Sequence, residues 1–165
     1  MEPDRPGEPF RLLFVCTGNT CRSPLAEVIA RRVAADRGWS RLEVRSAGIA
    51  TVNGGPASEG SERTAARHGL DLSSHRSTAL SPELLEWADL VLAMSPLHLA
   101  RVREGGAGEK AELLTSFATG GETGDAGDTV PDPFGGSDAD YEITFTVLEE
   151  LVGQALHRLA PLVAP

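Results

Sequence analysis

The chain has 165 residues and a formal net charge of −9, with a pI near 4.9. This length fits one domain that can bury a sizeable core. The acidic balance argues against nucleic acid or an anionic membrane as a partner, because both bind basic surfaces. Two cysteines are too few for a disulfide framework, so a reducing cytoplasm is expected. Residues 1–9 are polar and proline-rich, and we expect a disordered lead-in there, followed by a domain over residues 10–160.

The first part of the chain alternates between a strand pattern and a helix pattern. Residues Phe10–Cys16 are mostly apolar, which is typical of a parallel strand buried on both faces. Ser23 followed by Pro24 is typical of a helix start, because serine caps the first turn and proline has no N–H to lose there. The sequence therefore predicts a helix that is capped by Ser23, runs to about Arg37 and ends at Gly38.

The middle of the chain continues this alternation. A second strand is predicted over residues 42–46, followed by a helix within residues 56–69. Serine–proline pairs at positions 81–82 and 95–96 each predict a helix start. Between them, residues 89–94 predict a third buried strand.

The last part of the chain contains a short strand, a long loop and a final helix. Residues 111–115 predict a fourth strand, within a glycine-rich acidic loop that is expected over residues 105–129. Ser137 with Asp140 three positions later resembles a capping box. This pair predicts an amphipathic helix that runs to about Leu159.

Strands that alternate with helices favour a parallel sheet with helices on both of its faces. The predicted fold class is α/β, as a single-domain, three-layer α/β/α arrangement with a four-stranded parallel sheet. In such sheets, ligands bind at the carboxyl ends of the strands. The loop between the first strand and the first helix begins at Cys16 and is expected to lie at that edge.

Residues Cys16–Pro24 form the most informative motif, in which a cysteine and an arginine are separated by five residues. Cys16 is a candidate nucleophile for attack on phosphorus, and Arg22 has a planar fork that suits two phosphoryl oxygens. Gly18 and Asn19 tolerate the left-handed backbone that such a loop needs. The helix that follows directs free N–H groups at a bound anion and favours a thiolate. The motif predicts cysteine-dependent hydrolysis of a phosphate ester or a phosphoramidate.

Asp132 precedes a proline in a loop before the last predicted helix, and it is the candidate general acid. It would protonate the leaving group and then activate water against a phosphocysteine. Phe134 would form an apolar wall beside the substrate side chain. Ser23 could donate a hydrogen bond to the Cys16 sulfur as the phosphoenzyme breaks down. We expect neither a metal nor another cofactor, because His and carboxylate residues show no ligand spacing and a thiolate works without one.

Five segments together resemble the low-molecular-weight protein tyrosine phosphatase family, and the resemblance covers the chain from Phe10 to Leu159. These segments are Cys16–Pro24, Ser46–Gly48, Ser74–Arg76, Asp89–Met94 and Val130–Gly136. The resemblance implies phosphorylated proteins as substrates and inorganic phosphate as a product. It also implies a set of substrate-binding residues, which are Thr17, Gly18, Asn19, Thr20, Cys21, Arg22, Ser23 and Phe134.

The family also implies residues that support the loop. Its loop asparagine is held by a serine and a histidine from neighbouring loops, and Ser46 and His75 match these two positions. His75 is therefore expected to support the loop and not to act as a general base. The other histidines lack such a context and are expected on the surface or in helices; they are His68, His98 and His157.

Thr20 bears on the choice of substrate. Tyrosine phosphatases of this family usually carry an aliphatic residue at its position, which makes an apolar floor for a phenyl ring. A hydroxyl suits a guanidinium-phosphate better, and Asp132 could pair with that guanidinium. Together with Asp132–Gly136, where tyrosine phosphatases of the family often have a pair of tyrosines, Thr20 resembles the protein-arginine phosphatase branch. The alternative is a tyrosine phosphatase in which Thr20 is a neutral variant.

Three other classes of protein are alternatives to a phosphatase. A thioredoxin-coupled arsenate reductase needs two further cysteines, whereas this chain has only Cys21 beyond Cys16. A phosphocarrier would not require Asp132, and a non-catalytic phosphopeptide-binding module would lack the nucleophile. An enzyme with this loop is also expected to be redox-sensitive, because Cys16 and Cys21 fold back towards each other and could form a disulfide.

Overall fold

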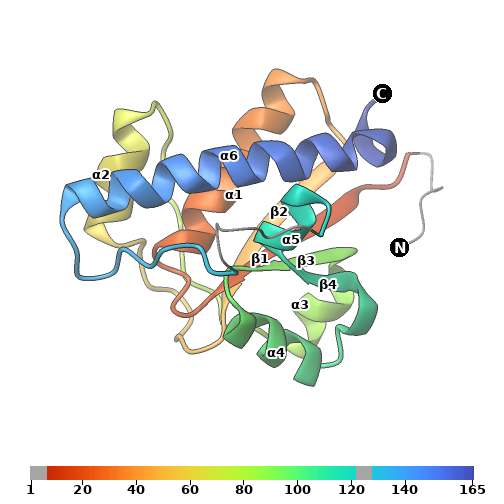
Figure 1. Cartoon of the computed structure of the whole chain (residues 1–165), viewed down its shortest axis with the longest axis horizontal. Helices are drawn as coiled ribbons and strands as arrows, with labels where there is room; N and C mark the ends of the chain where they lie inside the picture. The colour runs from red at the N-terminus through yellow and green to blue at the C-terminus, as the bar shows by residue number, and fades with distance from the viewer. Residues whose placement is uncertain (1–6, 122–127) are drawn as a thin grey trace.

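The centre of the molecule is a sheet of four parallel strands in the order β2-β1-β3-β4 (Figure 1). The strands are β1 (Phe10–Cys16), β2 (Leu42–Gly48), β3 (Leu90–Ala93) and β4 (Ala111–Leu113). The structure is a computed structural model that describes residues 7–121 and 128–165, so most of the expected lead-in lies outside the described residues. Within these residues, the predicted α/β class and the four-stranded parallel sheet are confirmed.

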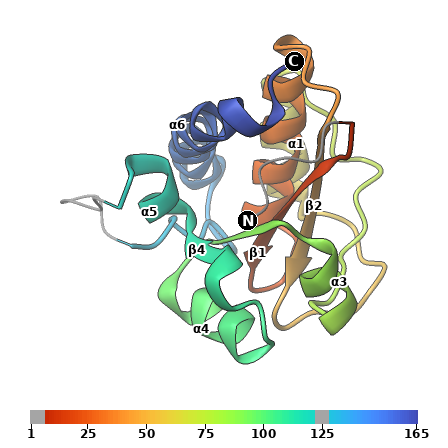
Figure 2. The same ribbon diagram turned by 90° about the vertical axis from the view of Figure 1, so that its right-hand side faces the viewer.

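Helices cover both faces of the sheet and make the three layers that the sequence predicts (Figure 2). One face is covered by α1 (Arg22–Asp36), α5 (Leu114–Thr119) and α6 (Asp138–Val163). The opposite face is covered by α3 (Pro82–Trp87) and α4 (Pro96–Glu104). The remaining helix, α2 (Glu59–Arg67), packs against α1 and α6. None of the helices in the described part of the chain is both long and apolar enough to cross a bilayer.

Strand β1 contributes side chains to both layers of the core. Leu12 and Phe14 pack in the cluster under α1 and α6, whereas Leu13 and Val15 pack in the cluster under α3 and α4. All four side chains are inaccessible to solvent. Complete burial of one such side chain is worth roughly 1.5–3 kcal/mol. Because β1 is held from both sides, its last residue, Cys16, has a fixed place at the carboxyl edge of the sheet.

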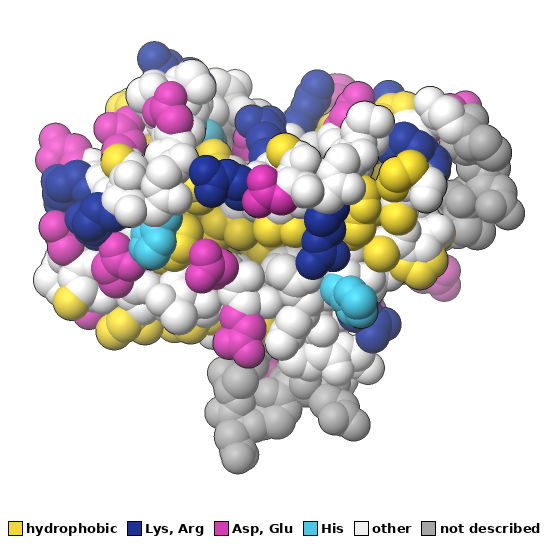
Figure 3. Space-filling model, turned by 90° about the horizontal axis from the view of Figure 1, so that it is seen from above, with side chains coloured by type: hydrophobic (Ala, Val, Ile, Leu, Met, Phe, Trp, Pro, Cys, Tyr) yellow, Lys and Arg dark blue, Asp and Glu magenta, His cyan; other side chains and the backbone are white. Residues whose placement is uncertain are grey.

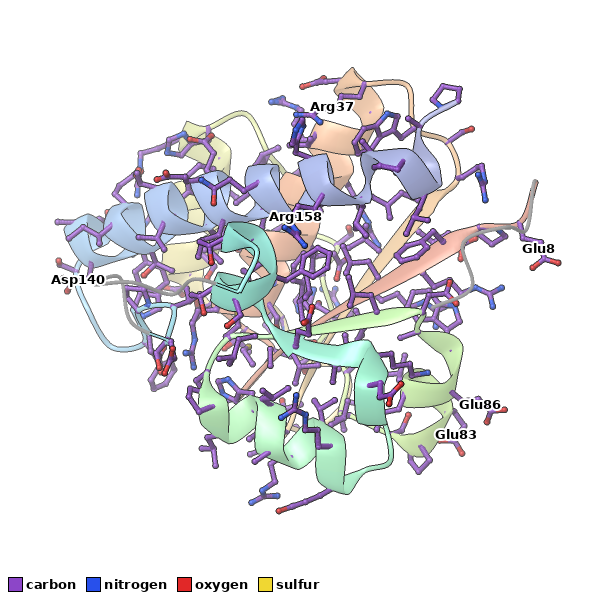
Figure 4. The ribbon with its side chains drawn as sticks, turned by 45° about the vertical axis from the view of Figure 1, so that its right-hand side comes forward. Glu8, Arg37, Glu83, Glu86, Asp140 and Arg158 are labelled. Atoms are coloured by element: carbon purple, nitrogen blue, oxygen red, sulfur yellow. The ribbon has the colours of Figure 1, made fainter. Side chains whose placement is uncertain are left out.

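Three predicted helix starts are confirmed, and one is wrong. Ser81 and Ser95 accept hydrogen bonds from the first turns of α3 and α4, and Ser137 makes the predicted capping box at the start of α6, where Asp140 lies (Figure 4). Ser23 does not cap α1, because this helix begins one residue earlier and Ser23 lies buried in its first turn.

The predicted loop over residues 105–129 contains more structure than expected. A short 3-10 helix precedes β4, and α5 follows it directly, so the predicted fourth strand is shorter than residues 111–115. Residues 122–127 of the loop lie outside the described residues. Helix α5 is too short for a sequence period to reveal it. It is held against α6 by Arg158, whose guanidinium carbon lies 5.4 Å from the centre of the Phe117 ring (Figure 4).

The last helix is longer than predicted, because α6 continues beyond Leu159 to Val163. Pro161 lies inside this extension and lacks the N–H that would complete the helical ladder. Val163 is 1% exposed, so burial of its side chain against the core offsets the missing hydrogen bond. On the face seen from above in Figure 3, Lys and Arg side chains are interspersed with Asp and Glu side chains.

Candidate active site

Cys16 ends β1 at the carboxyl edge of the sheet, where a ligand was expected. Its side chain is buried, and its Sγ atom lies 2.9 Å from the Ser23 Oγ atom in the first turn of α1. Gly48 at the end of β2 allows this loop to approach closely, because a Cβ atom on Gly48 would come within 2.6 Å of the Thr17 carbonyl oxygen. Any residue larger than glycine at position 48 would therefore collide with the loop of Cys16.

Asn19 is fixed on several sides at the turn of the loop. It adopts a left-handed backbone with φ 56°, as predicted, and its residue is completely buried. Its Nδ2 atom donates to the Ser23 Oγ at 2.8 Å and to the Ser46 Oγ at 2.9 Å. Its Oδ1 accepts the Thr78 N–H at 2.8 Å, and His75 Nε2 donates to its carbonyl oxygen at 2.8 Å. The structure thus places Ser46 and His75 in contact with Asn19, as the family resemblance implies.

Gly18 departs from the expectation, because it does not have the left-handed backbone that was predicted for it along with Asn19. The turn needs only one left-handed residue, and Asn19 provides it. A Cβ atom on Gly18 would lie 3.6 Å from the Thr20 Oγ1, which is ordinary contact. Neither its backbone conformation nor the space around it therefore requires a glycine at position 18.

The hydrogen bonds of Asn19 leave a hydroxyl hydrogen available next to the cysteine. The Ser23 Oγ accepts one hydrogen from Asn19, so its own hydroxyl hydrogen is free to point at the Cys16 Sγ. At the other end, Ser46 Oγ also accepts from Asn19 and donates to a Glu27 carboxylate oxygen at 2.6 Å. A continuous chain of hydrogen bonds therefore runs from Glu27 to Cys16 and presents a donor to the sulfur.

Arg22 connects the loop to the segment that carries the candidate acid. The Arg22 residue is 5% exposed, and its Nη1 donates to the Val130 carbonyl oxygen at 3.1 Å. Its Nη2 donates to the Thr17 Oγ1 at 3.4 Å and lies 3.6 Å from an Asp132 carboxylate oxygen. The guanidinium therefore lies between the loop of Cys16 and the segment before α6.

The segment that holds Asp132 is anchored by two hydrogen bonds just before that residue. The Val130 N–H donates to the Met94 carbonyl at the end of β3, and the Thr144 hydroxyl of α6 donates to the Pro131 carbonyl at 3.1 Å. Asp132 itself is half-exposed, and its Oδ1 accepts the Phe134 N–H at 3.1 Å. These contacts leave the other carboxylate oxygen of Asp132 facing Arg22.

A cavity of about 170 Å³ opens between the loop and this segment. Its lining residues are Cys16, Thr17, Gly18, Thr20, Cys21, Arg22, Asp132 and Phe134. Asn19, Ser23, Ser46 and His75 lie behind the loop and do not line this cavity. Phe134 is 75% exposed at the rim, so a bound substrate side chain would cover it. A larger hollow of about 350 Å³ lies on the far side of the loop and does not include Cys16.

The structure adds one residue that the sequence analysis missed. His98 was expected on the surface or in a helix; it does lie in α4, but its residue is only 2% exposed. Its Nε2 lies 2.8 Å from the Thr17 Oγ1, and its Nδ1 lies 2.9 Å from the Ser95 Oγ. Burial, together with the positive charge of Arg22, lowers the pKa of His98 to about 4, although Asp132 acts in the opposite direction.

A signal for His98 is present in the sequence. Ser95 predicts the start of α4 just after the third strand, and His98 comes three positions later, in the first turn. Since β3 lies next to β1, that turn had to lie at the same sheet edge as Cys16. Within the described residues, no group of three or more His, Cys, Asp or Glu side chains is arranged to hold a metal ion.

Comparisons with known proteins agree with this geometry. A family model described as low molecular weight phosphotyrosine protein phosphatase matches residues 11–162. A protein-arginine-phosphatase of Bacillus subtilis is 40% identical over 151 residues, which cover 90% of this chain and 95% of that protein. The low molecular weight protein-tyrosine-phosphatase PtpB of Staphylococcus haemolyticus is 32% identical over 152 residues, which cover 88% and 96% of the two chains.

One solved structure is similar in both sequence and fold. It is the YwlE arginine phosphatase, a mutant with a phosphorylated active-site serine. It superimposes with a TM-score of 0.83 at 38% identity, and the match covers 91% of this chain and 95% of that one. In that mutant, a serine that replaces a cysteine of the active site therefore carries a phosphoryl group.

Proposed function

The chain belongs to the low molecular weight phosphotyrosine protein phosphatase family, and we propose that it hydrolyses phosphoarginine in proteins through a phosphocysteine on Cys16. The observation that carries this proposal is the cavity itself, which Cys16, Arg22 and Asp132 line together with Thr20. A nucleophile, a cation for the phosphoryl oxygens and a proton donor for the leaving group are the three groups that this reaction needs.

In the first step, the Cys16 thiolate attacks phosphorus, and the bond between phosphorus and the leaving nitrogen breaks. Arg22 binds two phosphoryl oxygens as charge develops on them, which is where a planar guanidinium is most effective. Asp132 donates its proton to the leaving nitrogen. The substrate arginine leaves as a neutral or protonated guanidine, and the phosphoryl group stays on the sulfur.

In the second step, water attacks the phosphocysteine and Asp132, now a carboxylate, accepts a proton from it. The phosphorus–sulfur bond breaks and inorganic phosphate is released. The Ser23 hydroxyl lies 2.9 Å from the sulfur and is directed at it by Asn19, so it can stabilise the departing thiolate. Ser46 and His75 keep Asn19 in place and are proposed as supporting residues.

Thr20 supports phosphoarginine as the substrate. Its side chain lines the same cavity as Asp132 and Phe134, so a substrate side chain meets a hydroxyl, a carboxylate and an aromatic ring. A guanidinium can use all three groups, through hydrogen bonds to the hydroxyl and to the Asp132 carboxyl group and through stacking on the ring. Relatives named as protein-arginine-phosphatases, from Bacillus subtilis and Geobacillus stearothermophilus, point to the same substrate. The family and the Staphylococcus haemolyticus relative keep phosphotyrosine as the alternative.

The proposal includes a setting for the enzyme. Its partners would be phosphorylated proteins, with inorganic phosphate as product, and the domain that acts on them would be residues 10–160. The cytoplasm suits a nucleophile that must stay a free thiol, and Cys16 and Cys21 are both free. An acidic chain with mixed charge on the face in Figure 3 does not favour nucleic acid as a partner.

A direct comparison of two substrates tests the proposal. One peptide sequence would carry either phosphoarginine or phosphotyrosine, and phosphate release would be measured for each at matched concentrations. We expect a larger kcat/KM for phosphoarginine, and we expect Cys16→Ser to bind the phosphopeptide without turnover. A preference for phosphotyrosine would make the chain a tyrosine phosphatase, and the absence of turnover on both peptides would reject the phosphatase reaction.

A further inference from the structure

A short chain of polar groups lies behind one wall of the cavity and has no part in the mechanism described above. It begins with the Ser95 hydroxyl at the start of α4, 2.9 Å from His98 Nδ1. It continues from His98 Nε2 to the Thr17 Oγ1, 2.8 Å away. The Thr17 Oγ1 also accepts a hydrogen bond from Arg22 Nη2 at 3.4 Å. Ser95 and His98 are buried, whereas Thr17 lines the cavity.

The hydrogen positions in this chain follow from the partners of Ser95. The Ser95 Oγ accepts the backbone N–H of His98, at 3.4 Å, as the cap of α4. Within the described residues, the Ser95 hydroxyl hydrogen has no other acceptor within hydrogen-bond distance, so we assign it to His98 Nδ1. A neutral imidazole with a bonded lone pair on Nδ1 carries its hydrogen on Nε2. His98 therefore donates to Thr17 and does not accept from it.

Thr17 consequently receives two donors, one from His98 and one from Arg22. A hydroxyl oxygen has two lone pairs and a single hydrogen, so both lone pairs are occupied and the hydrogen must point elsewhere. The residue is exposed to the cavity that Cys16 and Arg22 also line. The direction left for the hydroxyl hydrogen is the space where a phosphoryl group would lie.

We propose that Thr17 donates a further hydrogen bond to the phosphoryl group, and that His98 is a positioning residue which acts through Thr17. The inference rests on the proposed function, because it needs a phosphoryl group on Cys16 or in its cavity. It also gives a reason for a polar, buried imidazole in α4, where an apolar residue would pack at lower cost. Since the imidazole must be neutral to accept from Ser95, its low pKa is consistent with this role.

The test is a double-mutant cycle that combines Thr17→Val with His98→Met. Valine keeps the shape of threonine without the hydroxyl, and methionine fills the imidazole space without a donor. The probes are turnover of para-nitrophenyl phosphate and the inhibition constant of inorganic phosphate. Each single variant is expected to weaken phosphate inhibition and to lower kcat/KM by roughly 10- to 150-fold, as for one lost hydrogen bond to a charged group.

The decisive result is the coupling between the two positions. If His98 acts through Thr17, His98→Met has no further effect in the Thr17→Val background. Thr17→Ser is expected to recover most of the loss seen with Thr17→Val, because it restores the hydroxyl. His157→Met is the matched control, since His157 is an exposed histidine of α6, and it should match the wild type in both measurements.

Additive losses in the cycle would overturn the inference, and so would a Thr17→Val variant with unaltered phosphate inhibition. If His98→Met does not fold, Ser95→Ala replaces it in the cycle, because without the serine hydroxyl Nδ1 can take the hydrogen. If the wild type turns over para-nitrophenyl phosphate but the two substitutions show no coupling, only this inference is rejected. A wild type that turns over no phosphate compound would reject the proposed function.

Discussion

Arg22 Nη1 donates a hydrogen bond to the Val130 carbonyl oxygen, 3.1 Å away, and Val130 comes two residues before Asp132 in the chain. The residue proposed to bind the phosphoryl group thus also holds the segment that carries the proposed acid. Both partners are buried, so this hydrogen bond is shielded from water. Substrate binding and the position of the acid are therefore connected through one guanidinium.

This connection makes Arg22→Lys a sharper test than Arg22→Ala. A lysine keeps the charge, but its ammonium group cannot bond to the Val130 carbonyl and to two phosphoryl oxygens in one plane. We expect kcat/KM to fall roughly 10²- to 10⁴-fold in Arg22→Lys, because two hydrogen bonds to charged groups are lost. Arg22→Ala, like Cys16→Ser, should abolish turnover. The measurement is steady-state kinetics with para-nitrophenyl phosphate, and retention of near wild-type kcat/KM in Arg22→Lys would contradict the bidentate role.

A second prediction concerns Asp132 as the general acid. Asp132→Asn should slow phosphoarginine and phenyl phosphate by roughly 10²- to 10⁴-fold, the usual contribution of a general acid. The loss should be smaller for para-nitrophenyl phosphate, because its leaving group needs no proton. Phosphate release is measured for all three compounds, with Asp128→Asn as a control from the same segment that does not line the cavity. Equal losses for good and poor leaving groups would remove Asp132 from this role.

Sequence patterns predicted the residues of the loop itself better than the residues that other elements bring to the site. Cys16 and Arg22 belong to one contiguous motif, so the sequence of a single loop was enough to predict that they lie at the same site. Ser23 was placed correctly beside the sulfur but was wrongly predicted to cap α1, because the tight loop starts the helix at Arg22. His98 was missed because its place at the site depends on β3 lying next to β1, which is a property of the whole sheet. Helix α5 was missed because six residues are too few to show a period.

A third prediction follows from the pKa of His98, which burial and Arg22 lower from 6.5 to about 4. The unfolded chain binds this proton more readily than the folded protein, so acid favours unfolding. The contribution of His98 to the free energy of unfolding is at its full value above about pH 6.5. It declines as the pH falls and is lost near pH 4. At about 1.4 kcal/mol per pH unit, the total is about 3 kcal/mol.

Urea unfolding would measure this contribution to the free energy of unfolding. The wild type and His98→Gln would be compared between those two pH values. The glutamine has no titrating group, so the difference in unfolding free energy between the two proteins should shrink or reverse as the pH falls. A difference that does not change with pH would mean that His98 titrates normally in the folded protein. The comparison with His98→Gln removes the contribution of the carboxylates, which titrate in both proteins.

A fourth prediction concerns oxidation. Cys16 and Cys21 are both free and buried, and the Cys21 Sγ lies 3.3 Å from Ser58 Oγ and 3.5 Å from Tyr141 Oη. Peroxide would convert the Cys16 thiolate to a sulfenic acid, and the Cys21 thiol would then condense with it to a disulfide and release water. Peroxide-treated wild type should therefore recover its activity in dithiothreitol. Cys21→Ser should recover less; equal recovery would show that Cys21 only packs the loop.

The last prediction tests the choice of substrate at Thr20, through two variants that separate its hydroxyl from its size. Thr20→Val keeps the shape and removes the hydroxyl, whereas Thr20→Ile also adds apolar bulk beside Asp132 and Phe134 in the cavity. A site built to bond a polar group rejects a substrate that cannot use it more sharply than an apolar site does. Both variants should lose phosphoarginine turnover, and only Thr20→Ile should gain on phosphotyrosine, because isoleucine offers a larger surface to the ring.

The ratio of the two kcat/KM values is the quantity to measure for Thr20. One buried hydrogen bond is worth about 1–3 kcal/mol, which corresponds to a change in this ratio of roughly 5- to 150-fold. The Cys16 chemistry should persist, so turnover of para-nitrophenyl phosphate serves as the internal control for both variants. If Thr20→Val leaves the ratio unchanged and Thr20→Ile alters it, then selection depends on bulk and not on the hydroxyl. If neither variant alters the ratio, Thr20 is a neutral variant, and its hydroxyl no longer supports the assignment to phosphoarginine.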